Sequence, residues 1–101
     1  MSTPTPQELD SLQRQVTEHA AERDRAAGAL RRQSTDVMRL RIAHAQGVAD
    51  EQDLRAAEAV EAEARRQYDR AEADLAAAKE LFRNAVDRYE AAAGQGTLAF
   101  A

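Results

Sequence analysis

Alanine alternates with larger residues along one heptad row in the second half of the chain. Beginning at Leu54 and stepping three and then four residues, this row consists of Leu54, Ala57, Glu61, Ala64, Tyr68, Ala71, Leu75, Ala78, Phe82, Ala85, Tyr89 and Ala92. A heptad repeat of this kind is typical of a helix that packs along its length against another helix. We call such a row a seam. Because alanine alternates with larger side chains along it, a second helix can pack against it at close range.

The first half of the chain carries a second seam in one unbroken heptad phase: Leu9, Leu12, Val16, His19, Arg23, Ala26, Leu30, Gln33, Val37 and Leu40. If the chain folds back about Gly47, residues whose numbers sum to 94 lie opposite each other, and large residues meet small ones. Gln33 then faces Glu61, and a single polar layer of this kind fixes the register of a coiled coil. The sequence therefore predicts an all-α fold, an antiparallel two-helix coiled-coil hairpin.

Local signals give the expected boundaries. Thr5 to Glu8 reads as a capping box with proline in the first turn, so helix one is expected over about residues 6–45 after a tail of residues 1–5. Gly47 can end that helix in the left-handed conformation with Val48 packed back on it, and Asp50 can cap the next helix after a turn at about 46–50. Helix two is expected over about 51–93, with Gly94 opening a flexible tail of residues 94–101. Gly28, followed by the short polar residues 34–36, predicts a kink or break in helix one.

The composition favours association with other chains. Hydrophobic residues make up 44% of the 101 residues, and most of them are alanine, so the core is expected to be small. The chain has no cysteine, so disulfide bonds cannot stabilise such a core. Apolar residues also lie off the seams, where they either widen the contact between the two helices or face a partner in a helical bundle. The tail adds two more, which are either part of a frayed end or anchors of a docking peptide. The candidate interaction residues are Met38, Ile42, Val60, Leu81, Val86, Leu98 and Phe100.

Charge is uneven along the chain. Residues 23–41 contain six arginines and two aspartates. Residues 51–63 contain five acidic residues and one arginine. In a hairpin these stretches lie side by side and compensate each other. The alternative is a nucleic-acid-binding stripe made of Arg25, Arg31, Arg32 and Arg39, but the net charge of −4 and the lack of a base-stacking platform argue against it.

The sequence offers no motif for catalysis, a cofactor, a metal ion or a small-molecule substrate. His19 and His44 are about six turns apart on one helix, so they cannot share a metal ion within one chain. The carboxylates of helix two have the spacing of a solvated helix surface and neighbouring arginines, which argues against a paired acid and base. The chain also has no apolar run long enough to span a membrane and no secretory signal. A cytoplasmic protein is expected, with signal-less export or incorporation into a virus particle left open.

Two resemblances follow from these residues. Gly47 to Asp50, with Asp53-Leu54 and alanines at a helical repeat up to Leu75, resembles the helical hairpins of outer-membrane efflux ducts and their periplasmic adaptors. The length, the two-helix plan and the turn at residues 45–47 are similar to the WXG100 proteins exported by type VII secretion. Ala45 stands where those proteins have tryptophan, and the Tyr-x-x-x-Glu pattern, Tyr68 to Glu72, falls within helix two. This resemblance implies a secreted helical hairpin.

Taken together, these features predict a non-enzymatic coiled-coil interaction protein. It would serve as a self-assembling structural subunit or as a small adaptor or chaperone of a larger assembly, such as a phage particle or a secretion machine. The expected partners are other copies of the chain, another protein, or both. A type VII secretion substrate and a helical protein that binds nucleic acid through residues 23–41 are the alternatives.

Overall fold

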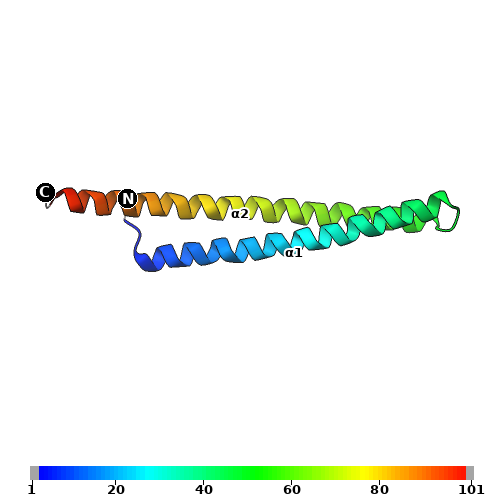
Figure 1. Ribbon diagram of the computed structural model, residues 1–101, viewed down its shortest axis with the longest axis horizontal. Coiled ribbons are helices and arrows are strands. Elements are labelled where there is room, and N and C mark those ends of the chain that lie inside the picture. The colour runs from blue at the N-terminus through cyan, green and yellow to red at the C-terminus, as the bar shows by residue number, and fades with distance from the viewer. Residues whose placement is uncertain (1–2, 100–101) are drawn as a thin grey trace. The chain divides into compact units, whose positions relative to one another are not determined.

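The computed structural model describes residues 3–99, and the side chains up to Gly94. It consists of two α-helices, α1 (Pro6–Ala45) and α2 (Glu51–Ala99), joined by a five-residue turn at 46–50. Residues 3–99 contain no β-strand. The two helices make many contacts with each other and form a helical hairpin (Figure 1). The predicted all-α hairpin is therefore confirmed.

The hairpin divides into two compact units, each of which contains part of both helices. The turn unit comprises Ala21–Glu72, and the terminal unit comprises Met1–Ala20 with Ala73–Ala101. The buried hydrophobic residues of the turn unit are Val37, Ala64 and Ala71, and those of the terminal unit are Leu75, Ala78 and Ala85. All six belong to the predicted seams. Four of them are alanine, so each unit has a thin core.

The N-terminus of α1 is closed by the predicted capping box. The Glu8 amide donates to Thr5 Oγ1 at 3.1 Å, and the Thr5 amide donates to Glu8 Oε2 at 3.4 Å. These reciprocal bonds satisfy amides that the first turn of a helix would otherwise leave without partners. They also engage the Glu8 carboxylate within the first turn of its own helix.

The turn has the geometry of a Schellman motif. Gly47 has a φ of 76°, the Gly47 amide donates to the His44 carbonyl at 3.0 Å, and the Val48 amide donates to the Ala43 carbonyl at 2.8 Å. A residue in the left-handed conformation with these two bonds ends a helix and satisfies its last carbonyls. Asp50 Oδ1 then accepts a bond from the Gln52 amide at 3.3 Å and caps α2. The Val48 side chain is exposed and does not pack back on α1, contrary to expectation.

The expected end of α2 at Gly94 is wrong, because the helix continues to Ala99. A glycine ends a helix when it takes a left-handed conformation, and among the described glycines only Gly47 has a positive φ. Gly94 stays helical after Ala91, Ala92 and Ala93, which are strong helix formers and offset the cost of about 1 kcal/mol that glycine carries. The flexible tail expected from residue 94 is therefore helical backbone as far as Ala99.

Helix α1 is also unbroken across residues 28–36, where we expected an interruption. The Thr35 hydroxyl donates to the Arg31 carbonyl four residues back, at 3.0 Å, so this short polar side chain bonds within the helix and does not compete with it. The lone Gly28 weakens the helix without ending it.

Candidate interaction site

The predicted off-seam residues are mostly exposed. Met38 is 64% exposed, Ile42 55%, Leu81 57% and Val60 50%. At least half of each of these four side chains is therefore left uncovered by the hairpin. Val86, in contrast, is half-buried. The Leu98 side chain and the whole of Phe100 lie outside the described residues, so neither interpretation of the tail is tested.

A shallow groove runs along the turn unit beside Val60. It has a volume of about 440 Å³ and is lined by Gln33, Asp36, Arg39, Leu40, Ala56, Ala57 and Val60. We call it the alanine groove, because the side chains of Ala56 and Ala57 are too small to fill the space next to α1. Sequence reasoning identified Val60 but missed the groove. The available signal was the pair of adjacent alanines four and three residues before Val60.

Met38 and Ile42 form a separate feature, which we call the ridge. They are one helical turn apart on α1, and neither lines the alanine groove. At 3.6 residues per turn, Met38 and the groove residue Leu40 project about 160° apart around the helix. Because Val37 between them is buried against α2, the ridge and the groove lie on different sides of the turn unit.

A polar layer crosses the turn unit. Arg23 Nη1 donates to Glu72 Oε1 at 3.0 Å, and the Tyr68 hydroxyl donates to the same oxygen at 3.0 Å. All three residues are half-buried. The hydrogen bond to Glu72 raises the pKa of Tyr68, and the bonds to Glu72 and Asp24 raise the pKa of Arg23. This layer joins α1 to α2 next to Ala71, the residue that the expected register places opposite Arg23.

The predicted polar layer of Gln33 and Glu61 is not formed as a bonded pair. Both residues are half-buried, but no hydrogen bond joins them in the described part of the chain. The long side chain of Arg23 reaches past Ala71, the residue opposite it, to the carboxylate of Glu72 on the side of α2. The side chain of Gln33 is too short to do the same. The bonded layer therefore lies at Arg23 and not at Gln33.

Replacing Tyr68 by phenylalanine is expected to destabilise the hairpin at neutral pH. Because the pKa of Tyr68 is raised in the folded chain, its protonated hydroxyl contributes stability that is complete below the unfolded pKa of about 10 and is lost as the pH rises through the folded value. The difference in melting temperature between parent and Tyr68→Phe should therefore be constant near pH 7 and shrink above about pH 10. The Tyr89 hydroxyl makes no hydrogen bond to described residues, so Tyr89→Phe is the control. Equal melting of both variants at pH 7 would contradict the polar layer.

The arginines of residues 23–41 are partly engaged by carboxylates. Arg25 pairs with Glu22, and Arg41 pairs with Glu58 at 3.7 Å. Arg31, Arg32 and Arg39, the other members of the proposed nucleic-acid stripe, form no ion pair with a described residue. The exposed pairs contribute about 0–1 kcal/mol each, so their main effect is to neutralise neighbouring charge.

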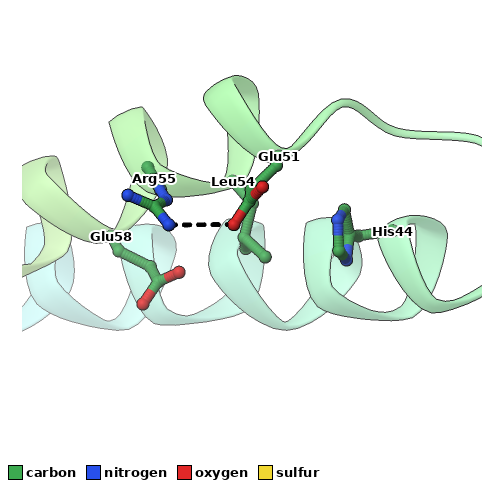
Figure 2. A pocket seen from close by; sticks show the side chains of 5 residues that line it. All are labelled: His44, Glu51, Leu54, Arg55 and Glu58. Atoms are coloured by element: carbon green, nitrogen blue, oxygen red, sulfur yellow. Dashed lines mark hydrogen bonds and ion pairs between the residues drawn. The ribbon is translucent and has the colours of Figure 1, made fainter.

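A second pocket lies beside the turn and is open to solvent. Its lining residues are His44, Glu51, Leu54, Arg55 and Glu58. Figure 2 shows the imidazole of His44 set apart from the ion pair of Arg55 and Glu51, whose atoms are 2.9 Å apart. The described residues contain no group of three His, Cys, Asp or Glu that could hold a metal ion. His19 is half-buried in the terminal unit, so the two histidines are not brought together in one unit.

Neither of the two helices has, over its described residues, a stretch long and apolar enough to cross a membrane. No protein-family model matches the chain, and no curated protein or solved structure matches it. The likeness to efflux hairpins and WXG100 proteins therefore rests on the quoted residues alone. In this structure, Tyr68 and Glu72 of the Tyr-x-x-x-Glu pattern bond to each other within the hairpin.

Proposed function

We propose that this protein is a non-enzymatic structural subunit whose hairpin associates with other copies of itself. The observation that carries the proposal is the distribution of apolar side chains. The buried hydrophobic residues are mostly alanine, whereas Met38, Ile42, Val60 and Leu81 are at least half exposed. Fully burying a methionine or isoleucine side chain stabilises a protein by about 1.5–3 kcal/mol relative to leaving it in water. Burying these exposed side chains between associated copies would add stability that a single hairpin cannot reach.

The amount of exposed surface supports the same proposal. The chain has an accessible surface of 7518 Å², whereas a compact monomer of 11.1 kDa is expected to expose about 5,700 Å². A stable protein interface buries about 1,200–2,000 Å² in total. The excess is therefore large enough to supply such an interface, and a thin core is the situation in which small proteins gain most from association.

Sedimentation equilibrium over a hundredfold range of protein concentration tests the proposal. We expect the average mass to rise above that of one chain, and the melting temperature to rise with concentration, because association stabilises the folded state by mass action. A constant mass of 11.1 kDa together with a melting temperature independent of concentration would refute self-association. That outcome would favour an adaptor whose exposed apolar residues are covered by a different protein.

A further inference from the structure

The short segment that precedes α1 contains a buried residue. Among the described residues outside the two helices, 3–5 and 46–50, Pro4 alone is buried, and its neighbours on both sides are exposed. Another part of the chain must therefore cover Pro4. Residues 5–8 are all exposed, and a contact with the half-buried Leu9 of the second turn would cover only one side of the proline ring. The start of α1 is thus not enough to bury Pro4.

Helix α2 is the element that can supply the remaining cover. Met1–Ala20 shares its compact unit with Ala73–Ala101, and Figure 1 shows the chain leaving the start of α1 in the direction of α2. In the register expected from the sequence, α1 begins opposite residue 88 of α2. Yet Ala92, the next alanine of the α2 seam, is half-buried, whereas Ala91 and Ala93 on either side of it are exposed. The seam of α2 is therefore covered beyond the first residue of α1.

We propose that residues 3–5 form a strap, which seats Pro4 on the seam of α2 beside Ala92 and holds the open end of the hairpin closed. The capping box fixes the first turn of α1 itself, whereas the strap ties that turn to the other helix. The contact lies within one chain, so this inference does not depend on the proposed self-association.

The sequence makes the strap stiff, because residues 3–6 read Thr-Pro-Thr-Pro. Each proline fixes its own φ at about −65°, and its ring keeps the threonine before it out of the helical conformation. Thr5 Oγ1 also accepts a bond from the Glu8 amide at 3.1 Å. A segment with so few accessible conformations loses little entropy when it docks. Pro4 can therefore be held on α2 at a smaller entropic cost than a flexible arm would require.

The strap matters most for the terminal unit, because the polar ties between the helices lie in the turn unit. The ion pairs of Arg23 with Glu72 and of Arg41 with Glu58 both join α1 to α2 within the turn unit. The buried hydrophobic residues of the terminal unit are one leucine and two alanines. Regions with little buried surface open locally while the rest of a protein stays folded. Release of the strap is therefore expected to open the terminal unit and to leave the turn unit closed.

Hydrogen exchange of the full chain, followed by mass spectrometry at a concentration at which the parent is monomeric, tests the strap. Pro4→Gln replaces the seated ring by a polar side chain, and Ala92→Gln obstructs the seat. In each variant we expect the amides of residues 9–20 and 75–89 to exchange about tenfold faster than in the parent. The amides of residues 21–72 should exchange as in the parent. The double variant should exchange no faster than the faster single variant, because both substitutions break the same contact.

Thr3→Gln and Ala91→Gln are the matched controls, because each introduces the same residue at an exposed neighbouring position and should exchange like the parent. Parental exchange in Pro4→Gln or Ala92→Gln, or equal acceleration in one of them and its control, would overturn the strap. Effects that multiply in the double variant would overturn it too, since Pro4 and Ala92 would then act at separate places. The same holds if residues 21–72 also exchange faster, because the substitutions would then act on the whole hairpin.

Discussion

Replacing Leu75 by alanine is expected to lower the free energy of unfolding by about 2–5 kcal/mol. Leu75 is 3% exposed and is the largest of the buried hydrophobic residues Leu75, Ala78 and Ala85 of the terminal unit. The buried alanines of that unit, Ala78 and Ala85, are too small to fill the cavity that the substitution leaves. Because small domains are stable by about 5–15 kcal/mol, the loss is a large part of the total. Urea unfolding followed by circular dichroism measures it.

Leu81→Ala is the matched control for this substitution. It changes the same residue type six positions further along α2, but Leu81 is 57% exposed. Both variants should be compared at a concentration at which the parent is monomeric, since association would add a separate contribution. We expect Leu81→Ala to unfold within about 0.5 kcal/mol of the parent. Equal losses from the two variants would mean that the α2 seam does not face α1.

Both ends of α1 and the start of α2 could be predicted because they depend on local chemistry. Thr5, Gly47 and Asp50 each act on amides or carbonyls within a few residues, and the structure shows the expected bonds at all three. The buried alanines could be predicted for a related reason. Heptad spacing fixes which side of a helix faces its partner, whatever the partner is.

The errors arose where one residue type permits two outcomes. Gly47 and Gly94 look alike in the sequence, yet Gly47 ends α1 with two backbone bonds and Gly94 continues α2. The bonded polar layer at Arg23 was missed because the reach of this side chain from the seam to a carboxylate on the flank of α2 was not considered. The alternation of side chains along a seam predicts which residues of the two helices lie opposite each other. It does not predict the rotamer of a long side chain.

The alanine groove was missed for a different reason. Its volume depends on the separation of α1 and α2 at Leu40, Ala57 and Val60, which is set by the packing of both helices together. The exposed ridge, in contrast, follows from the position of Met38 and Ile42 off the seam of one helix. Sequence patterns therefore located the ridge and not the groove.

Replacing Ala78 by leucine is expected to destabilise the hairpin by about 1–3 kcal/mol, although leucine is the more hydrophobic residue. Ala78 is 5% exposed, so the added carbons have no free volume and must push α1 away or adopt a strained rotamer. In a chain of this size each kcal/mol lowers the melting temperature by about 4–8 °C.

Ala77→Leu isolates that effect. Ala77 is the preceding residue of α2 and is exposed, and leucine and alanine have similar helix propensities. We therefore expect Ala77→Leu to melt close to the parent when both are monomeric, and Ala78→Leu to melt well below it. If Ala78→Leu instead matched or exceeded the parent, the seam would have room for larger side chains. Alanine at these positions would then not be what holds the two helices at close range.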